Sequence, residues 1–111
     1  MIMNMDDYQV KALRTAAPKD KKDEVYHLIL GLVGEAGEIA EKAKKVVRDK
    51  QADFSQMDLD DLTKELGDVL WYVAVLADHF DIKLDDVATR NIAKLADRQK
   101  RNVLYGSGDN R

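Results

Sequence analysis

Residues 21–50 carry the longest amphipathic pattern in the chain, and this pattern most constrains the fold. Apolar side chains recur at the i, i+3, i+4 spacing of one helical face. They are Val25, Leu28, Ile29, Leu32, Val33, Ala36, Ile39, Ala40, Ala43, Val46 and Val47. The pattern therefore predicts one long α-helix with a broad apolar stripe.

Similar spacing predicts three further helices, over residues 4–17, 55–80 and 84–101. Asn4 is suited to cap the first helix and Pro18 to end it, while Ser55 with Asp58 resembles a capping box for the third. Residues 102–111 contain two glycines and are expected to form a loop or tail. We therefore expect an all-α fold, a small bundle of about four helices in one domain over residues 1–111.

The composition bounds the size of the core and the available chemistry. A chain of 111 residues with 45% apolar residues is long enough for one core, but a monomer of this size buries only about 60–65% of its unfolded surface. Pairing of helices between copies would enlarge that core, so we expect a homodimer or homotetramer. The chain has no cysteine, so a metal must be held by oxygen or imidazole ligands.

Charge and hydropathy limit the partners. With 21 acidic against 18 basic residues and a net charge of −3, a broad surface for a nucleic-acid polymer is not expected. The longest apolar runs, LILGLVG and VLWYVAVLA, fall short of the ~20 residues that cross a bilayer, and the N-terminus lacks a signal-peptide pattern. We expect no membrane association and a cytoplasmic location, which is the host cytoplasm if a phage encodes the chain.

The segment GLVGEAGEIAE, residues 31–41, places glycines inside the long predicted helix. Each internal glycine costs roughly 0.5–1 kcal/mol relative to alanine. On a helical projection, Gly31 falls on the same flank as the nearby glutamates, where it could leave room for a ligand or another helix. Gly34 and Gly37 project to the far side, where close helix packing is the expected reason, and tight packing is an alternative for all three.

Two pairs of acids lie beside the apolar stripes of the two longest helices. Glu35 and Glu38 border the stripe of residues 21–50, and Glu65 and Asp68 border that of residues 55–80. Asp61 also lies beside the apolar stripe of residues 55–80, and most acids with this spacing are simply solvated. Four carboxylates in one cleft would repel one another unless a divalent cation neutralised them. Oxygen ligands favour Mg²⁺, Mn²⁺ or Ca²⁺.

The fourth predicted helix presents a polar stripe of Asn91, Lys94 and Arg98. Amide, ammonium and guanidinium groups in line suit phosphate oxygens, although such a stripe alone is more often an exposed face. Acids on two helices and this stripe on a third together indicate a site for a metal and a polyphosphate. His27 could contact a base or ribose or could simply be solvated.

The segments GLVGEAGEIAEKAKK, KELGDVLWYVAVLA and NIAKLADR resemble the MazG-like all-α nucleoside triphosphate pyrophosphohydrolases, which share an ExxE motif on one helix and an ExxD motif on the next. The resemblance runs from about Tyr8 to Arg101. It implies metal ligation by four carboxylates, substrate binding by four further residues, and a catalytic role for the first two acids. These are the metal ligands Glu35, Glu38, Glu65 and Asp68, the phosphate-binding Asn91, Lys94 and Arg98, and Tyr72 near the base or sugar.

The implied reaction is Mg²⁺-dependent hydrolysis of a nucleoside or deoxynucleoside triphosphate to the monophosphate and pyrophosphate, in nucleotide-pool sanitation or rebalancing. Mn²⁺ is a possible substitute, and Glu38, together with Glu35, is the expected catalytic group that shapes the attacking water. The family frequently has Tyr-Pro or Phe where this chain has Gln99-Lys100, so the closing wall of the pocket differs. The alternatives are a non-catalytic helical module that senses nucleotides and a structural helical oligomer whose acids are only surface.

Overall fold

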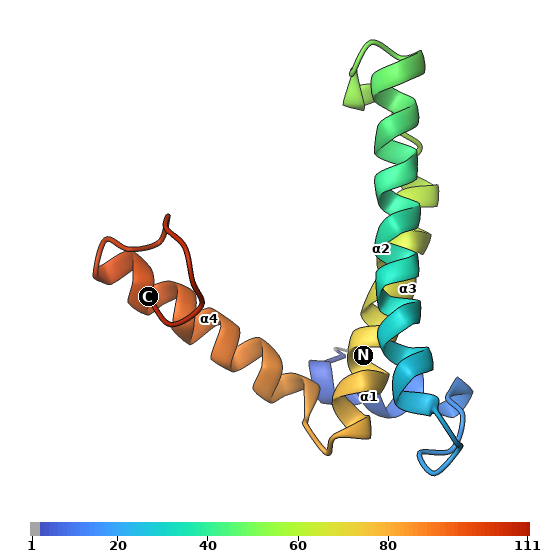
Figure 1. Ribbon diagram of the computed structural model, residues 1–111, viewed down its shortest axis with the longest axis vertical. Coiled ribbons are helices and arrows are strands. Elements are labelled where there is room, and N and C mark those ends of the chain that lie inside the picture. Colours follow the sequence, from blue (N-terminus) through green and yellow to red (C-terminus); the bar gives the residue numbers. More distant parts are fainter. Residues whose placement is uncertain (1–2) are drawn as a thin grey trace.

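A computed structural model describes residues 3–111 and contains four α-helices (Figure 1). The helices are α1 (Met5–Ala12), α2 (Glu24–Asp49), α3 (Leu59–His79) and α4 (Leu84–Lys100), with short 3-10 turns at Leu13–Thr15 and Phe54–Gln56. No strand occurs among the described residues, and the all-α fold is confirmed. Within residues 3–111, no helix is both long enough and apolar enough to span a membrane.

The two longest helices form an antiparallel hairpin that dominates the molecule. In Figure 1, α2 and α3 run side by side, α1 lies across one end of the hairpin, and α4 leads away from that end. The buried core lies near this junction and consists of Ala12, Leu28, Ala74, Val75 and Leu84. The indole Nε1 of Trp71 donates to the carbonyl oxygen of Ala12 (3.1 Å) and to Thr15 Oγ1 (2.9 Å), which ties α3 to the first helix.

The start of α3 differs from the prediction. The helix begins at Leu59 and not at Ser55, because the side chain of Asp58 is the N-cap and accepts from the backbone N–H of Asp61 at 3.1 Å. Ser55 instead binds the Asp53 carboxylate, to which both its N–H (3.1 Å) and its hydroxyl (2.6 Å) donate. Asp53 therefore holds residues 54–56 in a separate 3-10 turn.

Much of the predicted apolar stripe lies outside the seam between α2 and α3. Val33 on α2 is 65% exposed and Leu66 on α3 is 51% exposed, whereas Leu28 is 1% exposed. The radius of gyration is 16.9 Å, against about 13 Å for a compact domain of this length. An open shape with exposed apolar side chains results, because the helices meet along the flank that carries the acids.

The direction of α4 is set by side chains of α1. Lys83, at the N-cap position of α4, makes no side-chain capping bond. Instead the backbone N–H of Leu84 donates to Gln9 Oε1 (3.0 Å), and that of Asp85 donates to Asp6 Oδ1 (3.0 Å). Gln9 is buried, and its Nε2 also donates to carbonyl oxygens of Ala74 and Ile82, both at 3.0 Å. One glutamine thus joins α1, the end of α3 and the start of α4.

Candidate metal centre

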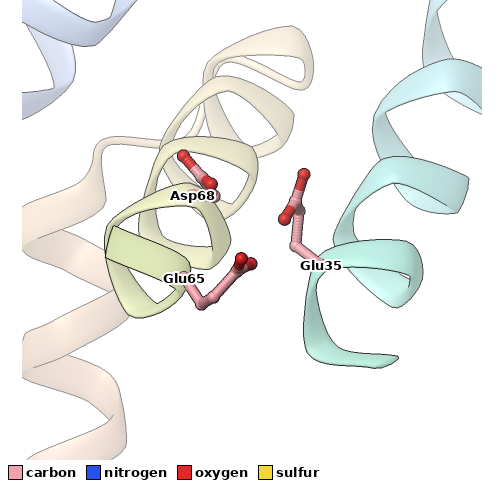
Figure 2. A group of neighbouring side chains, drawn as sticks. All are labelled: Glu35, Glu65 and Asp68. Carbon is pink, nitrogen blue, oxygen red and sulfur yellow. The ribbon is translucent and has the colours of Figure 1, made fainter. Parts of the chain in front are cut away.

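Three carboxylates converge in the seam between α2 and α3 (Figure 2). Glu35 projects from α2, while Glu65 and Asp68 project from α3, and one ligand atom of each lies within 4.8 Å of the others. Glu65 and Asp68 share a face because residues three apart in a helix are neighbours on its surface. The structure therefore brings together three of the four acids that the sequence singles out.

The electrostatics of this group favour the binding of a cation. Glu65 Oε2 is buried and has no hydrogen-bond partner among the described residues. Partial burial, followed by the neighbouring carboxylates of Glu65, Asp68 and Glu38, raises the pKa of Glu35 above its ordinary value. A cation bound between the carboxylates would satisfy the orphaned oxygen and offset the repulsion. The donor set, all carboxylate oxygen, fits a hard divalent ion such as Mg²⁺ or Mn²⁺.

Glu38 is exposed and lies outside this group of three. Its charge still acts on the centre, since it contributes to the raised pKa values of Glu35 and of Lys42. Lys42 itself was missed by the sequence reasoning. Its ammonium group forms an ion pair with Asp61 and lies 3.8 Å from Glu65 Oε1. Because Lys42 stands one turn after Glu38 on the same helix, the helical projection could have found it.

Tyr72 packs directly on the backbone of Gly31 beside the carboxylates. A Cβ atom added at Gly31 would lie 2.2 Å from Tyr72 Cε1, whereas one added at Gly34 or Gly37 would meet nothing within 4 Å. The Tyr72 ring is held edge-on against Trp71 with centroids 5.0 Å apart. Gly31 therefore leaves room for an aromatic ring of the same chain, and the two later glycines face open space in the single chain.

Replacing Gly31 with alanine should destabilise the protein. The added methyl group must displace the packed Tyr72 ring, and overpacking of this kind costs about 1–3 kcal/mol, which outweighs the helix propensity of alanine. The expected result is a lower midpoint of urea unfolding together with a changed near-ultraviolet circular dichroism spectrum of the aromatic rings.

Gly34→Ala is the matched control for this experiment. It adds the same methyl group on the same helix, at a position where the single chain has open space. The free energy of unfolding should therefore rise by roughly 0.5–1 kcal/mol, through helix propensity alone. Equal tolerance of both substitutions would show that Tyr72 does not rest on Gly31 in solution.

Other aromatic side chains surround Tyr72 at the edge of the centre. The ring of His27 lies 6.3 Å from that of Tyr72, measured between centroids. The pKa of Tyr8, on α1, is raised by burial and then by the negative charge of Asp68. Sequence spacing carries no signal for Tyr8, because its proximity to Asp68 depends on how α1 crosses α3.

The polar stripe of α4 lies apart from the carboxylates of its own chain. Figure 1 shows α4 leading away from the hairpin that carries the acids. Asn91 is exposed, whereas Lys94 and Arg98 are engaged by Asp109 of the C-terminal tail. The structure therefore does not bring the stripe and the acids together within one chain.

Comparison with known proteins identifies the family. The MazG nucleotide pyrophosphohydrolase domain matches residues 24–103. The chain belongs to the MazG family. It is also similar to the "Gene 37 protein" of Mycobacterium phage L5, with 48% identity covering 98% of this chain and 100% of the phage protein. No solved structure matches the chain significantly.

The MazG match gives the site a chemical context. The matched range contains all three carboxylates of the centre, Glu38 and the polar stripe of α4. It ends at residue 103, before the tail residue that contacts this stripe. The acidic centre thus lies inside the matched MazG range, and residue 109 lies outside it.

Proposed function

We propose that this chain hydrolyses nucleoside or deoxynucleoside triphosphates to the monophosphate and pyrophosphate in an Mg²⁺-dependent reaction, in nucleotide-pool sanitation or rebalancing. The observation that carries the proposal is the buried, unpartnered Glu65 Oε2 between Glu35 and Asp68, inside a MazG nucleotide pyrophosphohydrolase domain. A bound Mg²⁺ would supply charge neutralisation for the phosphate oxygens and for the carboxylates.

The residues of the chain have distinct proposed roles. Glu35, Glu65 and Asp68 would hold the cation, and the exposed Glu38 would serve as a fourth ligand. Glu38, which is exposed, would orient the attacking water together with Glu35. Tyr72, fixed against Gly31, offers an aromatic face to the base or sugar.

Phosphate binding is assigned to the polar stripe of α4. Asn91, Lys94 and Arg98 offer amide, ammonium and guanidinium donors in line on one helix, a set suited to phosphate oxygens. Because α4 leads away from the hairpin, the stripe can reach a nucleotide at the carboxylates only if α4 moves or a second copy supplies it.

We further propose that the chain acts as a homodimer or homotetramer. Apolar side chains on all four helices are exposed in the single chain, among them Val10 on α1, Leu30 and Val33 on α2, Leu66 on α3 and Ile92 on α4. A second copy would bury this surface, and it could also bring an α4 stripe to the acids. Light scattering should give a mass of two or four chains.

Product analysis tests the reaction. The wild-type protein, incubated with each NTP and dNTP and Mg²⁺, should release pyrophosphate and a nucleoside monophosphate, because the proposed cleavage leaves the terminal two phosphates joined. Ion chromatography separates pyrophosphate from orthophosphate.

Chelation by EDTA is the control, and it should abolish turnover until Mg²⁺ is restored. Orthophosphate as the first product would disprove the reaction. Nucleotide binding without turnover would favour the sensing module.

A further inference from the structure

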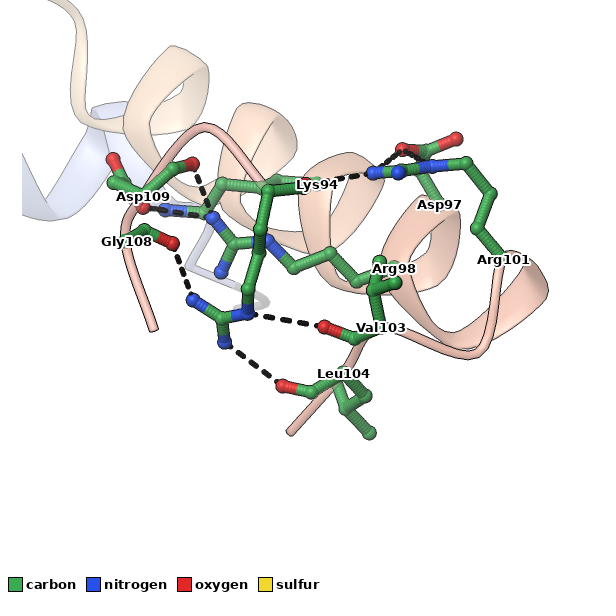
Figure 3. A network of polar contacts seen from close by, with 9 residues as sticks. Lys94, Asp97, Arg98, Arg101, Val103, Leu104, Gly108 and Asp109 are labelled. Carbon is green, nitrogen blue, oxygen red and sulfur yellow. Dashed lines mark hydrogen bonds and ion pairs between the residues drawn. The ribbon is translucent and has the colours of Figure 1, made fainter. Parts of the chain in front are cut away.

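The C-terminal tail folds back along the last turns of α4 (Figure 3). Arg111 closes the loop by donating to the backbone carbonyl oxygens of Val103 (3.0 Å), Leu104 (2.8 Å) and Gly108. Arg101, at the end of α4, donates to the carbonyl oxygen of Arg111 at 2.8 Å. The tail is therefore held in a defined conformation by its own backbone carbonyl groups.

This conformation places Asp109 on the basic part of the polar stripe. One carboxylate oxygen, Asp109 Oδ1, lies 3.0 Å from Lys94 Nζ and 2.9 Å from Arg98 Nη2. Arg98 Nη2 also donates to the backbone carbonyl oxygen of Asp109. An anionic oxygen shared between an ammonium and a guanidinium group is also how a phosphate oxygen would be bound there.

The Arg98 side chain is covered where the tail contacts it. The Arg98 side chain is 6% exposed, whereas that of Asp109 is 77% exposed. The guanidinium group is therefore covered while the residue that engages it faces solvent. A dissolved anion cannot form the same contacts with Arg98 as long as Asp109 occupies them.

We propose that the C-terminal tail is an intramolecular competitor of the nucleotide, with the Asp109 carboxylate occupying the phosphate-binding groups Lys94 and Arg98 until substrate displaces it. The inference rests on the proposed function, which assigns the triphosphate to this stripe. Because the ion pair is solvent-exposed on one side, it is weak enough to exchange. The apparent affinity for substrate is lowered by the fraction of molecules in which the tail is bound.

The test compares Asp109→Asn with the wild-type protein. The substitution removes the negative charge and keeps the size of the side chain, so inorganic tripolyphosphate should bind about threefold to tenfold more tightly. Isothermal titration calorimetry without divalent cations measures this affinity independently of turnover. In the activity assay, the same variant should show a similar decrease in KM with kcat unchanged.

Asp97→Asn is the matched control. Asp97 is also an acid near the end of α4, but it pairs with Arg101 (2.8 Å) and not with Lys94 or Arg98, so the affinity for tripolyphosphate should stay at the wild-type value. A chain ending at Tyr105, which lacks the tail contacts altogether, should bind tripolyphosphate at least as tightly as Asp109→Asn. It provides a second measurement if the point variant folds poorly.

The outcomes separate this inference from the proposed function. Unchanged or weaker tripolyphosphate binding by both altered tails, in a protein that releases pyrophosphate, would overturn the inference and leave the function standing. A wild-type protein that releases no pyrophosphate from any nucleotide would overturn the function, and the calorimetric comparison would still decide whether Asp109 competes for the anion site.

Discussion

Glu65→Gln should lower the rate of pyrophosphate release by about 10²- to 10³-fold, because it removes one anionic ligand of the proposed metal centre. A carboxylate oxygen of Glu65 lies within 4.8 Å of carboxylate oxygens of both Glu35 and Asp68. Its Oε2 is buried and has no hydrogen-bond partner among the described residues. A neutral amide ligates a hard divalent cation far more weakly than a carboxylate. Initial rates at saturating nucleotide and Mg²⁺ measure the loss.

In the absence of metal, Glu65→Gln should be more stable than the wild-type protein. Removing one of three repelling carboxylates and providing an N–H donor to Glu35 should stabilise the metal-free protein. The melting temperature should rise in EDTA, by roughly 4–8 °C for each kcal/mol gained, and the stabilisation that Mg²⁺ gives to the wild type should disappear.

Glu41→Gln is the matched control for Glu65→Gln. Glu41 is on α2, near the centre in sequence, but its exposed carboxylate pairs with Lys44 at 3.4 Å. Wild-type rates and a wild-type response to Mg²⁺ are expected. If Glu65→Gln retained full turnover, the seam between α2 and α3 would not be the catalytic centre.

Gln9→Met should destabilise the protein by about 2–4 kcal/mol, although the side chain stays nearly the same length. Three hydrogen bonds disappear, those to the carbonyl oxygens of Ala74 and Ile82 and that from the N–H of Leu84. The Leu84 bond is buried, and leaving such a donor unsatisfied costs about 1–3 kcal/mol by itself. Thermal unfolding should show a melting temperature lower by roughly 10 °C or more.

Hydrogen exchange locates the effect of Gln9→Met. The amide of Leu84 should lose its protection first, because Gln9 supplies its acceptor. Gln56→Met is the matched control, since Gln56 lies in an exposed 3-10 turn and donates only to Asp53 (2.9 Å). A Gln9 variant as stable as this control would mean that α4 is oriented by other contacts.

The helices themselves could be predicted because their signals are local. The i, i+3, i+4 spacing placed α2 and α4 within a few residues of their observed bounds. The predicted start of α3 was wrong because Ser55 donates its hydroxyl hydrogen bond to Asp53, which lies outside the predicted helix. The direction of α4 was beyond sequence reasoning, since it depends on Gln9, which is 75 residues from Leu84.

The candidate site was predictable to a similar degree. Angular position on two helices placed Glu35, Glu65 and Asp68 among the candidates, together with Glu38 and Asp61, and the structure brings the first three together. The same projection gave no reason to expect the helices to meet along this flank, leaving Val33 and much of the apolar stripe exposed. The contact of Asp109 with Arg98 was also unpredictable, because the loop between them has no periodic pattern.

The contact between Gly31 and Tyr72 has a consequence for the carboxylates. Gly31 lies one turn before Glu35 on α2, and Tyr72 lies one turn after Asp68 on the antiparallel α3. Sliding α2 by one turn along α3 would present a full side chain, His27 or Glu35, to the ring, because residues four apart share a helix face. Gly31, which has no side chain, therefore fixes the register of α2 against α3. The carboxylates of Glu35 and Asp68 repel each other, and the contact between Gly31 and Tyr72, one turn away, holds them close together without a bound cation.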